Sequence, residues 1–168
     1  SDNIVGVDWS DPMLEEARLL ELVERAWKMA SLEATPITAR PSLKLDFPPE
    51  TRLRTVRQQL GQALVNLFVN AIQAMEATPG SVRVTAAIDA GGTVISVFDS
   101  GPGIPVELRE RVFDPFFTTR TVGKGKGLGL SVAYGLVRGL GGTITVDSNP
   151  PRGAVLQVRL PAVTVPKE

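Results

Sequence analysis

Apolar residues recur at helical spacing in three stretches of the chain. In the first, residues 14–32, they fall every three or four positions and share one face. The pair Asp11-Pro12 before it supplies an N-capping side chain and a first-turn proline, which predicts that this helix begins there. The other two stretches predict helices over residues 56–75 and 130–140, the last ended by Gly141-Gly142.

Between and after the helices, apolar and polar residues alternate with a period of two, which is typical of strands. Strands are predicted at residues 43–47, 81–88, 93–98, 143–146 and 154–160, with a short helix at 107–111. This order predicts an α+β fold, a two-layer α/β sandwich whose mixed, mostly antiparallel sheet packs on about three helices. The folded domain is expected to cover residues 13–168, with residues 1–12 as a linker.

The second predicted helix carries amide side chains where a surface helix normally carries charges. No charged residue occurs between positions 58 and 73, and the polar positions recur at steps of three and four, so they form one stripe. The members of this amide stripe are Gln59, Gln62, Asn66, Asn70 and Gln73. An uncharged polar face on an otherwise apolar helix indicates that a ligand or another element covers it.

Composition narrows the classes of function. The 168 residues contain 18 basic and 18 acidic side chains, and this balance gives no indication of a nucleic-acid partner. Cysteine and histidine are both absent, which excludes thiol nucleophiles, disulfides and every site that needs an imidazole. No apolar run approaches the length of a membrane span, and residues 1–11 do not have the pattern of a signal peptide. We therefore expect a soluble, cytoplasmic chain, whether or not its parent protein is anchored in a membrane.

Glycine occupies every second position of residues 123–129, immediately before the third predicted helix. Glycines allow close backbone approach and a helix N-terminus offers free N–H groups, so the pattern is typical of phosphate binding. It is not a P-loop, because neither Lys124 nor Lys126 is followed by Ser or Thr, and it lacks the spacing of the dinucleotide fingerprint. The alternative interpretation is a flexible loop between two elements.

Asp99 stands at the end of a predicted buried strand and is followed by Gly101 and Gly103. A carboxylate there can accept hydrogen bonds from the amino group of a base, while the glycines leave room for a flat ring. Taken alone, the segment is better explained as a plain turn, since Asp, Gly and Pro are common turn residues.

Asn66 and Asn70 lie four residues apart, so their side chains project from the same face of the predicted helix. Mg²⁺ prefers oxygen ligands and usually shares the phosphates of its substrate, a role that neutral amides suit. The alternative is a structural pair that satisfies buried backbone groups.

In chain order, four motifs resemble the ATP-binding catalytic domain of sensor histidine kinases: N-x-x-x-N, D-x-G-x-G, F-D-P-F-F and G-x-G-x-G-L-G-L. That family shares a superfamily with DNA gyrase, the Hsp90 chaperones and MutL, so the resemblance implies a Bergerat-type ATP-binding fold. The last hairpin, with Gly153, fits the final box of the family. Two segments, Asn-Ala-Ile-Gln-Ala-Met and Asp-Pro-Phe-Phe-Thr-Thr-Arg, are most similar to the nitrogen-regulation and dicarboxylate-sensing branch of the family.

The resemblance implies a role for each matching residue. Asn70 would bind Mg²⁺ and Asn66 would face the phosphates, and these two are the expected catalytic residues. Asp99 would recognise the adenine amino group in a pocket shaped by Gly101 and Gly103. The full set expected to bind Mg-ATP is Asn66, Asn70, Gln73, Asp99, Gly101, Gly103, Ile104, Phe117, Thr118, Thr119, Arg120, Lys124, Gly125, Lys126, Gly127, Leu128 and Gly129.

Further residues match the lid of the family, and three positions depart from the family's pattern. Residues 118–126 match a mobile lid, anchored by a hydrophobic box whose members are Phe113, Phe116 and Phe117. Gln62 replaces a frequent Glu, Gln73 a frequent Lys or Arg, and Ala154 a frequent Ser or Thr. The helix therefore has no acid that could serve as a base, and one phosphate-binding cation is missing.

Because the chain has no histidine, the phosphoacceptor of such a kinase lies elsewhere. The resemblance implies a domain, monomeric on its own, that transfers the γ-phosphoryl group of Mg-ATP to a histidine on a separate dimerisation domain of the same parent protein, with a response regulator downstream. Residues 1–12 would then end the region that carries the acceptor helices. Two alternatives are a stand-alone serine kinase of the anti-sigma-factor type and a non-catalytic nucleotide-binding interaction module, the latter favoured by Gln62 and Gln73.

Overall fold

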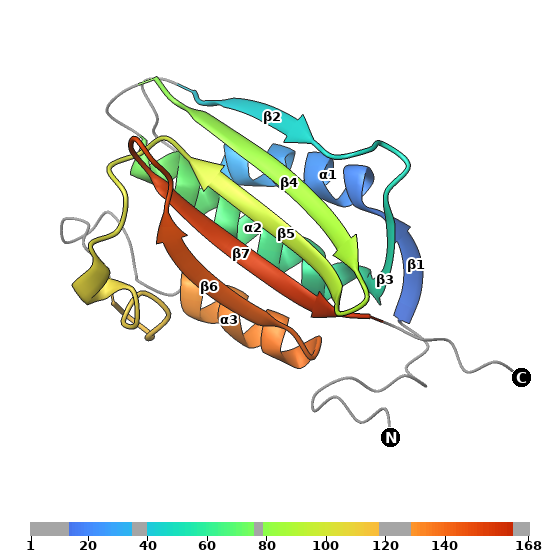
Figure 1. Ribbon diagram of the computed structural model, residues 1–168. Helices are drawn as coiled ribbons and strands as arrows, with labels where there is room; N and C mark the ends of the chain where they lie inside the picture. Colours follow the sequence, from blue (N-terminus) through green and yellow to red (C-terminus); the bar gives the residue numbers. More distant parts are fainter. Residues whose placement is uncertain (1–13, 35–39, 76–78, 118–128, 163–168) are drawn as a thin grey trace, which may run out of the picture.

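A layer of helices covers one face of a sheet (Figure 1). The computed structural model describes residues 14–34, 40–75, 79–117 and 129–162. Within these ranges the α-helices are α1 (Leu19–Glu33), α2 (Arg57–Ala74) and α3 (Gly129–Gly139), and a 3₁₀ turn, η1, covers Val106–Leu108. The predicted two-layer α+β fold with three helices is confirmed.

The strands of the main sheet lie in the order β2-β4-β5-β7-β6. They cover Ser42–Asp46 (β2), Ser81–Asp89 (β4), Gly92–Asp99 (β5), Ala154–Pro161 (β7) and Thr143–Ser148 (β6). β2 pairs with β4 in parallel, whereas the other neighbouring pairs are antiparallel. The sheet is therefore mixed and mostly antiparallel, as the sequence predicts.

The hydrophobic core fills the space between the sheet and the helices. Val84, Val97 and Leu156 stand in register on β4, β5 and β7 and are all buried. In the helical layer, the rings of Trp27 and Phe68 meet edge-on with their centroids 5.4 Å apart, which joins α1 to α2. Because α2 packs on both α1 and α3, the amide side chains that it carries stand on a rigid support.

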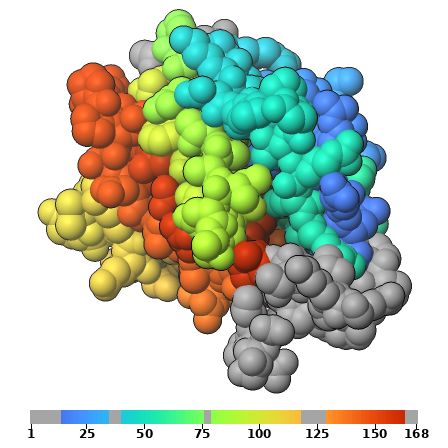
Figure 2. All heavy atoms as spheres, turned by 45° about the vertical axis from the view of Figure 1, so that its right-hand side comes forward, coloured from blue at the N-terminus to red at the C-terminus, as the bar shows by residue number. Residues whose placement is uncertain are grey.

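The start of the described chain differs from the prediction. Residues 14–18 form a strand, β1 (Leu14–Arg18), and α1 begins only at Leu19. β1 pairs antiparallel with a strand that was not predicted, β3 (Arg52–Val56), and the two lie side by side, blue and teal, in Figure 2. The helical prediction for residues 14–18 was wrong because Leu-Glu-Glu-Ala-Arg favours a helix locally, and only pairing with a distant segment selects the strand.

Smaller differences concern the predicted element ends. The short helix predicted at 107–111 is instead η1 followed by hydrogen-bonded turns, such as the one from Arg111 N to Leu108 O at 2.9 Å. The predicted N-capping pair Asp11-Pro12 and the linker 1–12 lie outside the described residues. In the part of the chain that the structure describes, no helix is long and apolar enough to cross a membrane.

Candidate functional site

Asp99 is the last residue of β5, and its side chain lies on the inner face of the sheet. The residue is 4% exposed. Its Oδ1 accepts two backbone hydrogen bonds, from Gly101 N at 2.9 Å and from Ala154 N at 3.3 Å. Burial raises the pKa of this carboxyl above its ordinary value, although the two N–H groups act in the opposite direction. Both hydrogen bonds from described residues reach Oδ1, which leaves Oδ2 as an acceptor for a ligand.

Two glycines let the β6–β7 turn approach the loop that follows Asp99. Gly153 has φ +118°, and a Cβ there would overlap the carbonyl oxygen of Asp99. Gly103 has φ +82°, and a Cβ there would lie 2.9 Å from the carbonyl oxygen of Gly153. A side chain at either position would be strained and would push the two segments apart. The turn therefore forms a wall beside the buried carboxylate.

Two side chains of the same turn hold the backbone of that loop. Asn149 Nδ2 donates to the carbonyl of Asp99 at 2.9 Å, and Arg152 Nε donates to the carbonyl of Gly101 at 3.1 Å. These roles of Asn149 and Arg152 are not predicted by the sequence, because a proline-rich turn carries no signal for contacts with residues 50 and 51 positions earlier. Only the pairing of β5 with β7 brings these segments together.

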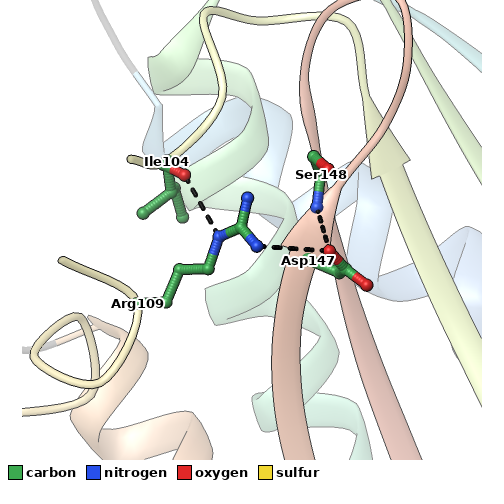
Figure 3. Close-up of polar contacts among 4 residues, drawn as sticks. All are labelled: Ile104, Arg109, Asp147 and Ser148. Atoms are coloured by element: carbon green, nitrogen blue, oxygen red, sulfur yellow. Dashed lines mark hydrogen bonds and ion pairs between the residues drawn. The ribbon is translucent and has the colours of Figure 1, made fainter. Parts of the chain in front are cut away.

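A further link joins the segment after the loop to β6 (Figure 3). Arg109 donates from Nε to the carbonyl of Ile104 at 3.3 Å and from Nη1 to Asp147 Oδ1 at 3.2 Å. The same Asp147 oxygen accepts from Ser148 N at 2.7 Å. The Arg109 side chain is 23% exposed whereas that of Asp147 is 76% exposed, so only the guanidinium side of the ion pair is shielded from water. It fixes Ile104, the residue expected to line the base pocket, relative to the sheet.

The amide stripe of α2 runs from this loop to the start of α3. Ala74, the last residue of α2, lies next to Gly101, where an added Cβ would be 3.2 Å from the Ala74 Cβ. Two turns earlier, Asn66 Nδ2 donates to the carbonyl of Gly129, the first residue of α3, at 3.1 Å. The helix rises about 12 Å between Ala74 and Asn66. One helix face therefore spans the distance between the two ends of the candidate site, with Asn70 midway.

The amides of Asn70 and Gln73 are partly exposed on α2 and make no hydrogen bond within the described residues. Their oxygens are therefore available to a ligand. The described residues contain no cluster of three or more His, Cys, Asp or Glu side chains that could hold a metal. The donor set at Asn70 suits a magnesium ion that takes its other ligands from phosphate and water.

The hydrophobic box of Phe113, Phe116 and Phe117, here called the phenylalanine box, contacts neighbouring side chains through two of its three rings. The ring centroid of Phe113 lies 5.4 Å from that of Tyr134 on α3, and the guanidinium of Arg111 lies 4.8 Å from the centroid of Phe117. Phe116 has φ +65° and is 74% exposed. The expected lid contacts lie outside the described residues: Thr118, Thr119, Arg120, Lys124, Gly125, Lys126, Gly127 and Leu128.

Comparison with known proteins identifies the family. Residues 55–164 match the family described as histidine kinase-, DNA gyrase B-, and HSP90-like ATPase. The chain belongs to this ATPase family. A relative is the C4-dicarboxylate transport sensor protein DctB of Rhizobium meliloti, 39% identical over 111 residues, which are 65% of this chain and 18% of DctB. The ATPase domain spans between 14% and 31% of the length of the curated relatives it first matches.

Solved structures agree with this assignment. The ATPase domain matches the catalytic domain of histidine kinase ThkA with a TM-score of 0.72 and 31% identity, over 88% of this chain and 95% of ThkA. Full-length ShkA in complex with AMPPNP matches with a TM-score of 0.74 and 29% identity, over 96% of this chain and 33% of ShkA. The chain is thus an ATP-binding domain of the sensor histidine kinase type, and the resemblance seen in the sequence is confirmed.

The fold of this ATPase domain brings the expected residues together in two groups. One group, on the loop that leaves β5, contains Asp99, Gly101, Gly103 and Ile104. The other contains Asn66, Asn70 and Gln73 on α2 and, through the bond from Asn66, Gly129 at the start of α3. The arrangement offers a buried acceptor at one end and neutral amides at the other.

Proposed function

We propose that this domain binds Mg-ATP and donates its γ-phosphoryl group to a histidine on a separate dimerisation domain of the same parent protein, with a response regulator downstream. The observation that carries the proposal is the line along α2. A buried carboxylate with an available oxygen lies on the loop beside Ala74, the last residue of α2, and Asn70 and Asn66 follow at about 6 and 12 Å along the helix from Ala74. An extended nucleoside triphosphate has a base at one end and phosphates at the other. Membership of the ATPase family and the likeness to ShkA, which was solved with AMPPNP, support this assignment.

At the base end, Asp99 would select adenine over guanine. Its Oδ2 accepts hydrogen bonds, and adenine carries an amino group at C6, whereas guanine carries a carbonyl oxygen there. Guanine would leave two acceptors facing each other in a buried site, and each unpaired polar group costs about 1–3 kcal/mol. The discrimination would come from this unpaired carbonyl as much as from the favourable contact with adenine.

At the phosphate end, Asn70 would hold Mg²⁺ together with phosphate oxygens, and Asn66 would face the phosphates. The bound ion would neutralise phosphate charge during transfer. Phosphoryl transfer depends mainly on positioning and charge stabilisation, so a domain without a nucleophile of its own can support it. The remaining expected contacts, at Gln73, Gly129 and residues 118–128, belong to the same proposal.

The acceptor would reach the γ-phosphate from a partner domain, since no histidine occurs among the 168 residues. Four large apolar side chains are exposed on the η1 and phenylalanine-box segment and on α3: Val106, Phe116, Val132 and Tyr134. The contact between Phe113 and Tyr134 holds the two segments together. This apolar surface, next to the start of α3, would receive the acceptor domain.

Transfer is tested with radiolabelled ATP and a purified histidine-bearing acceptor domain. We expect acid-labile phosphate on the acceptor with the wild type in Mg²⁺, and a loss of most transfer with Asn70→Ala or with chelator. Acid-stable phosphoserine on a partner would instead support the serine kinase alternative. Tight ATP binding without any transfer would support the interaction module, in keeping with the neutral Gln62 and Gln73.

A further inference from the structure

A chain of two side-chain hydrogen bonds connects α2 to α3. Gln62 Nε2 donates to Asn66 Oδ1 at 2.9 Å, and Asn66 Nδ2 donates to the carbonyl of Gly129 at 3.1 Å. Gln62 and Asn66 are one helical turn apart, whereas Gly129 is the first residue of α3. The start of α3 is therefore bonded to α2 through a residue that itself depends on Gln62.

The carbonyl of Gly129 determines how both amides are turned. A backbone carbonyl can only accept, so Asn66 must present its NH₂ group to Gly129 and its oxygen to Gln62. The oxygen of Asn66 is also only an acceptor, so Gln62 must present its own NH₂ group. Position 62 therefore needs a hydrogen-bond donor, and an ionised carboxylate of the same size would have none.

We propose that Gln62 is a positioning residue for Asn66. By donating to Asn66, it keeps the amide of Asn66 turned toward Gly129 and so ties the start of α3 to α2. Gln62 needs no contact with a ligand for this role. The proposal goes beyond nucleotide binding, because it gives a physical reason for an uncharged amide at this position of the helix.

The variant Gln62→Glu exchanges donor and acceptor in the hydrogen bond between residue 62 and Asn66. At neutral pH the carboxylate accepts only, and a charge-assisted bond from Asn66 Nδ2 to it is stronger than the neutral bond to Gly129. Asn66 then turns its NH₂ group toward residue 62, which places its oxygen against the Gly129 carbonyl and breaks the link. Once the carboxyl is protonated, near its ordinary pKa of about 4.3, it can donate again and the link returns.

The test follows the side-chain amide of Asn66 by NMR in the labelled 168-residue chain. In the wild type we expect an NOE between the Asn66 amide protons and Gly129 Hα at every pH from about 7 to about 4. In Gln62→Glu the NOE should be absent at neutral pH and return on acidification. In Gln62→Lys, whose side chain can only donate, it should persist.

Gln58→Glu is the matched control, because it adds the same charge to an exposed position one turn earlier on α2. It should leave the NOE intact at every pH. An NOE that persists in Gln62→Glu at neutral pH would overturn the proposal. Equal loss of the NOE in Gln58→Glu would overturn it as well, because the effect would then be one of charge alone.

A second readout rests on the proposed function. Gln62→Glu should weaken AMPPNP binding on the order of threefold to tenfold, the effect of one hydrogen bond, and leave adenosine binding unchanged. Gln58→Glu should bind both like the wild type. Failure of the wild type to bind adenine nucleotides would contradict the proposed function while the NMR result stands. Unchanged AMPPNP affinity in Gln62→Glu, with a binding wild type, would overturn the role of Gln62 alone.

Discussion

The backbone of Gly153 is in close contact with the backbone of Asp99. Its φ of +118° lets the β6–β7 turn come so close that a Cβ at position 153 would overlap the Asp99 carbonyl oxygen. The next residue, Ala154, donates its N–H to the carboxylate of the same aspartate at 3.3 Å. The position of the turn and the orientation of the buried carboxylate are therefore coupled.

Gly153→Ala should separate the two segments. The methyl group meets the Asp99 backbone and the left-handed φ adds strain, so we expect a loss of about 2–4 kcal/mol in the free energy of unfolding. Adenosine binding should be lost as well. Urea denaturation measures the first and calorimetry the second. Gly135→Ala in α3 is the control, since a Cβ there meets nothing within 4 Å. The control should gain about 0.5–1 kcal/mol in stability. Equal stability of Gly153→Ala and wild type would show that the close approach of the turn to Asp99 does not require glycine at position 153.

Asp99→Asn should separate binding from stability. The Asn oxygen can still accept from Gly101 N and Ala154 N, but an NH₂ group then replaces the available Oδ2. Two donors would face each other at the adenine amino group, so adenosine binding should be abolished. Unfolding should require at least as much urea as for the wild type, because a buried charge has been removed. Retained adenosine binding would show that Asp99 does not recognise the base.

The effect of pH should follow from the raised pKa of Asp99. A carboxyl whose pKa is raised by folding stabilises the protein when protonated, and this contribution is lost as pH rises through the pKa of the folded state. The stability of the wild type should therefore increase relative to Asp99→Asn as the pH is lowered through that pKa toward 3.8, the ordinary value of the unfolded chain. Adenosine affinity should fall over the same range, because the protonated carboxyl no longer offers both oxygens as acceptors. A pH-independent stability difference between the two proteins would refute this.

The ion pair between Arg109 and Asp147 should make a small, measurable contribution. The 3.2 Å separation and the shielded guanidinium predict a coupling of about 0.5–1 kcal/mol in a double-mutant cycle with Arg109→Met and Asp147→Asn. The pair Arg159–Asp89 is the control: its carboxylate is less exposed than Asp147, but its arginine is more exposed and the atoms lie 3.9 Å apart, so its coupling should be near zero. Arg109→Met should also weaken adenosine binding, because it releases the carbonyl of Ile104. Similar couplings for the two pairs would show that the shielding of Arg109 is without effect.

Patterns local in sequence predicted most of the fold and suggested the candidate site residues, whose roles stay a prediction. The amide stripe on α2 was visible because its members repeat at helical spacing, and Asp99 because a strand and two glycines surround it. β1 was missed because its partner β3 lies far along the chain and its own residues favour a helix. In β3, Leu53 and Thr55 alternate with Arg52 and Arg54, and this period of two was a signal in the sequence that could have predicted the strand.

The contacts that position the candidate site could not be predicted from the sequence either, because they also join segments that lie far apart along the chain. Asn149 and Arg152 contact a loop some fifty residues earlier, and Asp147 pairs with Arg109, 38 residues earlier, across strands whose register only the folded sheet defines. The bond from Asn66 to Gly129 likewise joins two helices that are adjacent only in the structure. Residue types were sufficient to suggest a chemistry, whereas its supporting contacts required the fold.

We propose that the buried carboxylate of Asp99, at one end of α2, accepts a hydrogen bond from the amino group of adenine. Calorimetric titration of the wild-type chain with ADP and GDP in the presence of Mg²⁺ tests it most directly. We expect ADP to bind and GDP to bind on the order of ten- to a hundredfold more weakly, the effect of one unpaired polar contact. Equal affinity for ADP and GDP, or no binding of either, would contradict it.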